Sequence, residues 1–151
     1  MYKNEYMLLA LENAKKAFEI DEVPVGAIIV KDGKVIASTY NQKEHLKDTT
    51  GHAEILAIRE AEKLLDSHYL NDCDMYVTLE PCIMCAGAII QSRIRSVYFG
   101  AYDLKGGAFG SSIDVPSAHN INHHPSVFGG FIKEECSTLI SEYFKRKREE
   151  K

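Results

Sequence analysis

The chain has 151 residues, of which 45% are hydrophobic and 26% charged, so we expect one soluble, globular domain over residues 1–151 with a buried core. The formal net charge of −4 gives no general sign of a nucleic-acid binder, and Glu12, Lys15 and Lys16 interrupt the apolar N-terminal residues before a signal peptide or membrane span could form. We therefore expect a cytoplasmic protein without a membrane partner, whose cysteines favour metal binding over disulfides.

Helices are expected where apolar residues recur every three or four positions, and strands where they form short runs. Asp32-Gly33 is a hairpin signal, and Thr49 or Thr50 is placed to cap the helix after the polar loop. Interleaved strands and helices predict an α/β layered domain. The first half should hold a helix at about Glu5–Glu19, strands at Val25–Val30 and Lys34–Tyr40, a loop at Gln42–Gly51 and a helix at about His52–Leu65. The second half should hold strands at Met75–Leu79 and Ser96–Phe99 around a helix from Cys82 to about Ser92, an aperiodic segment at Ile113–Pro125, a short strand at Val127–Phe128 and a helix at about Ile132–Arg148.

Two short motifs carry the residues of a metal site. His52-Ala53-Glu54 and the run from Pro81 to Cys85 supply one imidazole and two thiolates, three ligands that leave a fourth position open, as in catalytic zinc sites. Cys82 and Cys85 share one helical face at i and i+3, near a helix N-terminus that lowers thiol pKa values. His52 and Glu54 can both reach one metal only from the first turn of their helix. The sequence therefore predicts one Zn²⁺ per subunit.

Glu54 is placed to move protons rather than to bind metal. Zinc held by the three ligands would lower the pKa of a water toward ~7, which suits hydrolytic deamination of an amino-substituted base. Taken singly, His52 could be an ordinary buried histidine, and the cysteines could form a structural metal site or a redox pair. Their combination with Glu54 favours a zinc-dependent deaminase.

The sequence signals at the C-terminal end and at Asn41 indicate a function less specifically. Residues 145–151 carry five basic and two acidic side chains, which on composition alone favours a solvated helix end over a phosphate-binding surface. Asn41, directly after an expected strand, alone indicates turn chemistry.

Over nearly its whole length the chain resembles the bacterial tRNA-specific adenosine deaminases. The resemblance is carried by Val23–Ala27, Thr78–Ala88 and Glu142–Phe144, and most specifically by residues 99–108, which read Phe-Gly-Ala-Tyr-Asp-Leu-Lys-Gly-Gly-Ala. It implies a cytidine-deaminase-like, three-layer α/β/α fold with a five-stranded mixed sheet, assembled as a homodimer. It also implies conversion of the wobble adenosine in a tRNA anticodon stem-loop to inosine.

The resemblance also implies roles for single residues. Asn41 would hydrogen-bond the flipped base, Val25 would line its pocket, and Asp103 would contact the sugar–phosphate beside the target. Stacking and cations hold single-stranded loops, so Phe144 and Arg148 favour RNA contact at the basic end. The remaining positions expected near the anticodon loop are Lys105, Asn122 and His123.

One departure from the family concerns the loop before His52. Residues 48–51 read Asp-Thr-Thr-Gly, where the family usually has Asp-Pro-Thr-Ala. Losing a proline and gaining a glycine should leave this loop less preorganised.

Two other functions remain open from the sequence. A deaminase of free cytosine, guanine or a nucleoside would share the zinc site, but it would need neither the loop at Asp103 nor an aromatic, basic end. A catalytically silent RNA-binding subunit could keep zinc for folding, but it would have no use for the proton shuttle Glu54.

Overall fold

The computed structural model describes residues 1–150, and Lys151, the last residue of the predicted basic end, lies outside the described residues. Within them, no helix is long and apolar enough to cross a membrane. The helices are α1 (Asn4–Glu19), α2 (Lys43–Leu46), α3 (Ala53–Leu65), α4 (Ile83–Gln91), the 3₁₀ turn η1 (Val115–Ser117) and α5 (Lys133–Glu149). The strands are β1 (Gly26–Lys31), β2 (Lys34–Tyr40), β3 (Cys73–Leu79), β4 (Ser96–Ala101) and β5 (Ser126–Gly129).

The strands form one mixed sheet in the order β2-β1-β3-β4-β5. β1 runs antiparallel to β2 and β3, whereas β3, β4 and β5 are parallel to one another. At the end of the β3–β4 pair Leu79 lies opposite Ala101, and the amide of Glu80 donates to the carbonyl of Ala101 at 2.9 Å. The residues that follow both strands therefore leave the sheet side by side.

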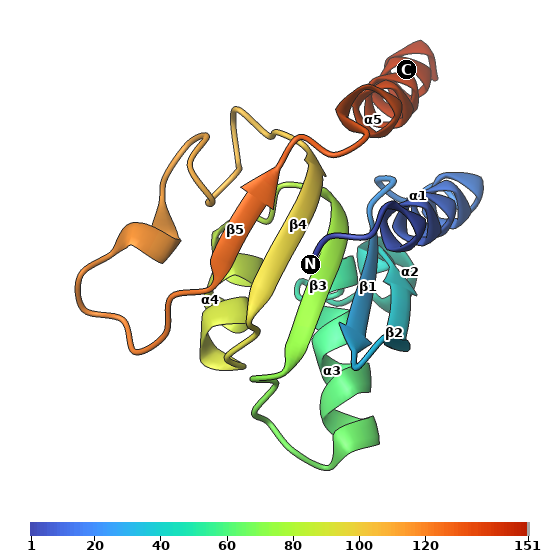
Figure 1. Ribbon diagram of the computed structural model, residues 1–151. Helices are drawn as coiled ribbons and strands as arrows, with labels where there is room; N and C mark the ends of the chain where they lie inside the picture. The colour runs from blue at the N-terminus through green and yellow to red at the C-terminus, as the bar shows by residue number, and fades with distance from the viewer. Residues whose placement is uncertain (151) are drawn as a thin grey trace.

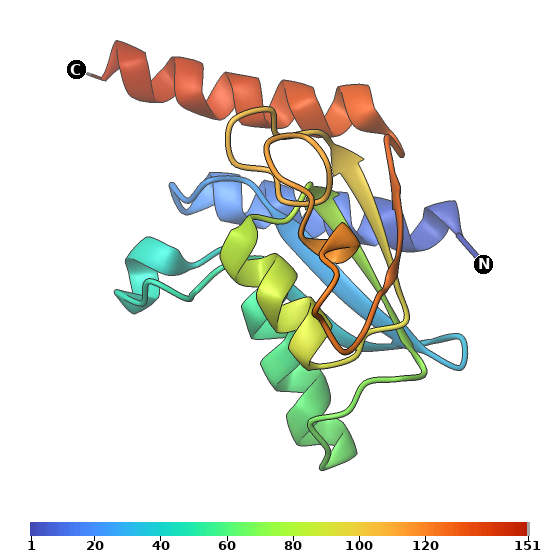
Figure 2. The ribbon, with the colours of Figure 1, turned by 90° about the vertical axis from the view of Figure 1, so that its left-hand side faces the viewer.

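Side chains that alternate along the strands fill two separate cores. Ala27 and Ile29 of β1 face the layer of α3 and α4, whereas Ile28 and Val30 face α1. The views in Figures 1 and 2 show α3 and α4 on one side of the sheet and α1 and α5 on the other. This arrangement confirms the three-layer α/β/α fold with a five-stranded mixed sheet.

The loop predicted over residues 42–51 contains a helix. α2 forms there because the carboxylate of Glu22 accepts the amides of Glu44 (3.1 Å) and His45 (2.7 Å). Glu22 lies 22 residues earlier in the chain, so local residue patterns could not indicate this short helix.

The predicted threonine cap of α3 is also wrong. His52 is the N-cap residue and makes no side-chain cap hydrogen bond. Thr50 instead donates its hydroxyl to Asp48 Oδ1 at 2.7 Å, while Thr39 of β2 holds the helix start by donating to the carbonyl of Ala53 at 2.7 Å. The aperiodic segment before β5 contains the single turn η1, and β3 and β4 are each two residues longer than expected.

Basic residues near the end of α5 bind α1 and the turn that follows α1. Lys147 Nζ lies 2.8 and 3.0 Å from the carboxylate oxygens of Asp21, and the guanidinium of Arg146 lies 4.4 Å from the ring centre of Phe18. Tyr143 adds a hydrogen bond from its hydroxyl to the carbonyl of Asp21 at 3.3 Å. These contacts hold the basic helix beside the edge of the sheet from which the loop after β4 leaves.

Candidate active site

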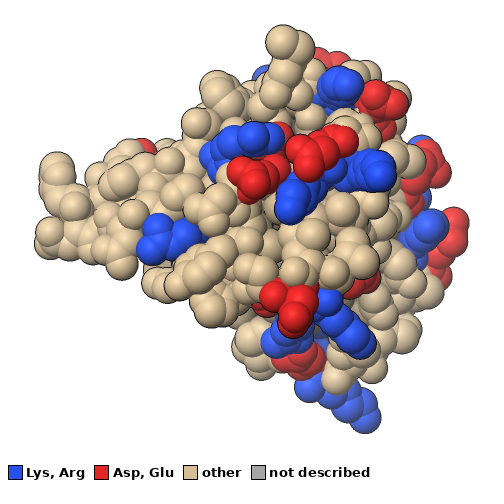
Figure 3. Space-filling model, turned by 60° about the horizontal axis from the view of Figure 1, so that its bottom comes forward, with Lys and Arg blue, Asp and Glu red and all other residues tan. Residues whose placement is uncertain are grey.

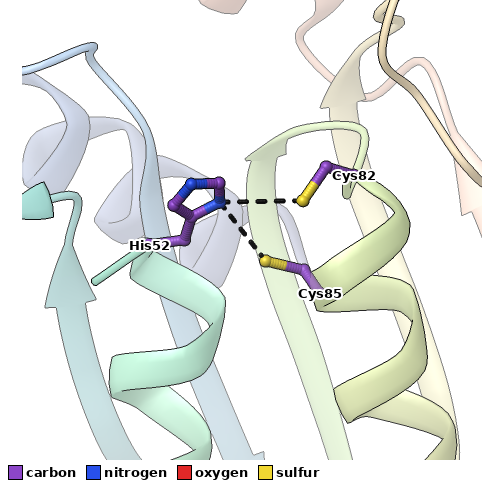
Figure 4. A group of neighbouring side chains, drawn as sticks. All are labelled: His52, Cys82 and Cys85. Carbon is purple, nitrogen blue, oxygen red and sulfur yellow. Dashed lines mark hydrogen bonds between the residues drawn. The ribbon is translucent and has the colours of Figure 1, made fainter. Parts of the chain in front are cut away.

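Two helix N-termini meet and bring the predicted metal ligands together. His52 is the N-cap residue of α3 and Cys82 is the N-cap residue of α4, each with extended backbone angles. Figure 4 shows the imidazole of His52 directed at both sulfurs, with Nδ1 3.7 Å from Cys82 Sγ and 3.5 Å from Cys85 Sγ. Cys85 is fully buried in the first turn of α4.

The spacing of these three atoms fits a zinc ion. In a tetrahedral site with ordinary Zn–N and Zn–S bond lengths, a nitrogen and a sulfur ligand lie about 3.6 Å apart. The two observed N···S distances fall on either side of that value, and all three ligand atoms lie within 4.8 Å of one another. The geometry therefore agrees with the prediction that His52, Cys82 and Cys85 form one site.

The protonation of the two cysteines is unequal. A hydrogen bond from Cys85 is the main reason that the pKa of Cys82 is lowered to about 4. As the donor of that bond, and because it is buried, Cys85 has a raised pKa. The same sulfur of Cys82 hydrogen-bonds His52 and raises the pKa of the imidazole. The lowered pKa of Cys82 favours its thiolate form, which is the form that binds zinc.

Glu54 lies in the first turn of α3 and is only 4% exposed. Burial is the main cause that raises the pKa of its carboxyl to about 7, and the nearby Cys82 thiolate raises the pKa further. A carboxyl group that titrates near neutral pH can both accept and return a proton. Glu54 therefore lies in the pocket wall beside the three predicted ligands, and its role as a proton shuttle stays a prediction.

A pocket of about 200 Å³ opens in front of this cluster. Val25, Asn41 and Asp103, for which the resemblance implied substrate contacts, are among the residues that line it. A second pocket, of about 400 Å³, shares Asp103 with the first and continues between the loop after β4 and α5. The other residues of the first pocket are Val23, Lys43, His52, Ala53, Glu54, Leu79, Glu80 and Cys82.

Asn41 is buried and already bonded to backbone at both ends of its amide. Its Nδ2 donates to the carbonyl of Val23 at 3.1 Å, and its Oδ1 accepts the amide of Lys43 at 3.2 Å. These bonds fix the orientation of the amide at the pocket wall, so turn chemistry and pocket lining are combined in one residue.

Asp103 holds its own loop while it borders both pockets. Its Oδ1 accepts the amides of Lys105 (3.2 Å) and Gly106 (3.0 Å). Lys105 and the half-exposed Phe144 of α5 line the second pocket together with Tyr102 and Leu104. The structure therefore brings the predicted residues Asp103, Lys105 and Phe144 together.

Three predicted residues lie elsewhere within the single chain. Asn122 lines a separate small pocket with Gln91 and Arg93 at the far end of α4, and His123 Nε2 lies 2.6 Å from the carbonyl of Ile94. Arg148 is exposed in the last turn of α5 and lines neither of the two pockets at the cluster.

Lys43 and Glu80 line the first pocket and were not predicted from the sequence. The signal for Glu80 was present, because it directly precedes the Pro81-Cys82 motif. Lys43 had no signal in the polar loop, since its place at the pocket depends on the helix α2.

The chain matches known deaminases over most of its length. The sequence model of the MafB19-like deaminase family matches residues 1–136. A tRNA-specific adenosine deaminase of Aquifex aeolicus is 48% identical over 148 residues, which cover 98% of this chain and 97% of that protein. One of Bacillus subtilis is 43% identical over 146 residues, covering 97% of this chain and 91% of its relative.

Solved structures agree with these sequence matches. A structure from studies of A-to-I editing by tRNA:A34 deaminases at the wobble position of transfer RNA superposes with a TM-score of 0.89 at 46% identity, covering 91% of this chain and 99% of that one. A guanine deaminase from Nitrosomonas europaea superposes with a TM-score of 0.79 at 27% identity, covering 94% of this chain and 84% of the other. With its near full-length relatives, this chain belongs to the tRNA-specific adenosine deaminases of the deaminase superfamily.

Proposed function

We propose that this tRNA adenosine deaminase uses one zinc ion per subunit to convert the wobble adenosine of an anticodon stem-loop to inosine. The observation that carries the proposal is the His52, Cys82 and Cys85 cluster beside the buried carboxyl of Glu54. The name of the relatives and the described wobble-position editing of the structural neighbour support the choice of substrate.

The chain's own residues divide the chemistry between them. Zinc, when bound, supplies a Lewis acid that activates water at neutral pH. Glu54 would take one proton from the attacking water and pass it to a ring nitrogen of the base. It would then take the second proton, from the hydroxyl group added to the ring, and pass it to the amino group that leaves as ammonia. Its pKa of about 7 suits both the uptake and the release of the proton.

Asn41 and Val25 are proposed to hold the flipped base. The amide of Asn41 is fixed at the pocket wall by its backbone partners, and Val25 offers an apolar surface in the same pocket. An amide can both donate to and accept from the edge of a base, which a purely apolar pocket cannot do.

The second pocket is proposed to receive the nucleotides beside the target. Asp103 borders both pockets, so it is placed to contact the sugar–phosphate where the strand passes from one to the other. Lys105 supplies a cation and Phe144 an exposed aromatic ring, the two kinds of group that hold single-stranded RNA. Arg148 lies on the same helix and would add a phosphate contact further along.

A homodimer is proposed to pair through the face of α4. No charged residue occurs from Ile83 to Gln91, and the side chain of Ile83 is 64% exposed. The adjoining segment 111–125 carries one formally charged residue, and Figure 3 shows few charged side chains on the part that projects at the left, where this segment lies. Two copies related by a two-fold axis across α4 would bring Asn122 and His123 of one near the pocket of the other.

The alternative of a free-base deaminase is favoured by one observation, the superposition with a guanine deaminase. Its separate test is substrate choice. Because tRNA is the proposed substrate, we also propose a cytoplasmic location.

The deciding experiment incubates zinc-loaded protein with an arginine-tRNA anticodon stem-loop that bears a wobble adenosine, and separately with free cytosine, guanine and adenosine. A matched stem-loop with its adenosine moved one position away from the wobble site is the control. Inosine only at the wobble position supports the proposal. Ammonia from a free base instead would show a small-molecule deaminase, and silence throughout with zinc bound would show a non-catalytic subunit.

A further inference from the structure

Glu80 is a buried carboxylate whose hydrogen bonds all go to one loop. Its side chain is 2% exposed and sits between the end of β3 and the Pro81-Cys82 motif. Oε1 accepts the amide of Asp103 at 3.1 Å and also the hydroxyl of Ser111. Oε2 accepts the amides of Phe109 at 3.0 Å and Ser111 at 3.1 Å. Three amides and a hydroxyl from both ends of the 103–111 loop thus meet on one carboxylate.

The loop backbone closes directly over this carboxylate. A Cβ atom on Gly107 would lie 2.5 Å from Glu80 Oε1 and 2.5 Å from the carbonyl oxygen of Asp103, so no side chain fits at this position. The amide of Gly107 donates to the carbonyl of Asp103 at 2.8 Å, and the amide of Ala108 donates to the carbonyl of Pro81 at 2.8 Å. The glycine is therefore required by the close approach of loop and carboxylate.

The carboxylate also joins the loop to the helix that carries the cysteines. Glu80 lines the first pocket beside Asp103, and it lies two residues before Cys82. A displacement of the 103–111 loop would move Asp103 and Lys105 relative to the cluster, although it would leave the ligands themselves in place. Apart from the bond between the Ala108 amide and the Pro81 carbonyl, the hydrogen bonds that tie residues 103–111 to the end of β3 all go to the Glu80 side chain.

We propose that Glu80 is a positioning residue, which fixes the 103–111 loop so that Asp103 and Lys105 meet the RNA strand in register with the reacting base. The proposal rests on the proposed RNA contacts of that loop. Glu80 has no proton-transfer role in this proposal, because both of its carboxylate oxygens accept hydrogen bonds from the loop.

Glu22 provides a matched comparison, because it is a second buried carboxylate that accepts backbone amides. It is 1% exposed and accepts the amides of Glu44 and His45 and a ring nitrogen of His45, the last at 2.7 Å. Glu22 holds α2 as Glu80 holds the 103–111 loop, but it makes no hydrogen bond with residues 103–111 within the described chain.

The test is a double-mutant cycle with the zinc-loaded protein and the wobble-adenosine stem-loop as substrate. In Glu80→Gln one acceptor oxygen becomes an NH₂ group that faces amide donors, so we expect the stem-loop KM to rise about tenfold, the effect of losing one hydrogen bond to a charged group. kcat should change less than about threefold, with zinc content unchanged. In an Asp103→Ala background, Glu80→Gln should raise KM by less than about twofold, because both changes remove the same contact. For the control pair Glu22→Gln and Asp103→Ala, the KM of the double variant should instead change by the product of the two single-variant factors.

Amide exchange of the RNA-free protein gives a second readout. The amides of Phe109 and Ser111 should exchange faster in Glu80→Gln and stay unchanged in Glu22→Gln. Should Asp103→Ala leave KM unchanged, the proposed RNA contact fails, and the exchange rates alone decide whether Glu80 fixes the loop. Two results would overturn the proposal. One is unchanged exchange of the Phe109 and Ser111 amides in Glu80→Gln, and the other is a KM of the double variant equal to the product of the two single-variant factors. If Glu80→Gln does not fold, Ser111→Ala removes one donor, and it should show a smaller KM rise with the same non-additivity.

Discussion

Cys85 Sγ lies 3.5 Å from His52 Nδ1, although 32 residues and the whole of β3 separate the two residues in the chain. The contact exists because α3 and α4 pack side by side on one face of the sheet and start at the same edge. We expect Cys85→Ala and His52→Ala to bind less than about a tenth of the zinc of the parent protein and to lose activity, since a three-ligand site cannot lose one ligand and keep its affinity. Zinc per subunit, measured by elemental analysis, checks this. Cys73→Ala is the control, because Cys73 is buried in the core outside the cluster and should keep the metal.

Glu54 should be separable from metal binding. We expect Glu54→Ala to keep one zinc per subunit and an unchanged circular dichroism spectrum while inosine formation falls by about 10²–10⁴-fold, the range for loss of a general acid–base group. Single-turnover inosine formation and zinc analysis on the same preparation check this. Loss of zinc together with activity would show that Glu54 is a ligand rather than a proton carrier.

Position 49 offers a test of the loop before His52. We expect Thr49→Pro to leave the melting temperature unchanged or to raise it by up to about 3 °C, because proline restricts the unfolded chain. Within residues 1–150 the amide of Thr49 has no hydrogen-bond acceptor to lose. Gly51→Ala makes a contrast, since a Cβ there would lie 3.1 Å from the carbonyl of Asp48 and 3.2 Å from Lys43 Cα and should not stabilise. A clear fall in the melting temperature of Thr49→Pro would contradict this account of the loop.

The basic end of α5 should divide into two functions. Arg146 and Lys147 contact Phe18 and Asp21, whereas Arg148 is exposed and makes no ion pair within the described residues. We expect Arg148→Ala to weaken stem-loop binding and to reduce the slope of log K against log salt by about 0.7, the value for one phosphate contact on a single strand. Binding at several salt concentrations, measured by fluorescence anisotropy, checks this. Glu150→Ala is the control and should leave the slope unchanged or steeper.

Cys136 should limit stability in alkali. Burial raises the pKa of its thiol to about 12, above the ordinary value of 9.0 that the unfolded chain regains. Between these two values the folded state binds more protons than the unfolded state, so stability is fully present below pH 9 and falls as the pH rises toward 12. Urea unfolding of the parent and Cys136→Ala at pH 8, 9 and 10 checks this. The decline above pH 9 should be shallower in the variant, even though the variant loses packing beside Gly100 at every pH.

The ligands of the candidate site could be predicted because their spacing is local. Cys82 and Cys85 lie on one helical turn, and His52 and Glu54 lie in another, so two short motifs contain the whole cluster. Glu80 and Glu22 could not be given roles in the same way. Their donors lie 23 to 31 and 22 to 23 residues away, and a buried acid in a sequence carries no mark of the backbone amides that it will accept.

The two errors in the predicted fold, the missed helix α2 and the wrong cap of α3, also arise from contacts between residues distant in the chain. The helix α2 is held by Glu22, and the start of α3 is held by Thr39 of β2, so both depend on residues that are distant in the chain. The bounds of helices with regularly spaced apolar residues, such as α1 and α5, were predicted to within a residue or two. Asn122 and His123 followed a family resemblance, and a single chain does not bring them to the pocket.

The parallel pairing of β3 with β4 separates the position of the sulfur ligands from the course of the 103–111 loop. Leu79 opposite Ala101 fixes where both strands end, so the cysteine helix and the 103–111 loop begin from adjacent, rigid points. The loop can then change in length or sequence without moving the sulfur ligands, provided that it still offers amides to an acceptor at position 80. In this way the loop that is proposed to meet the RNA can vary while the sulfur ligands keep their place at the start of α4.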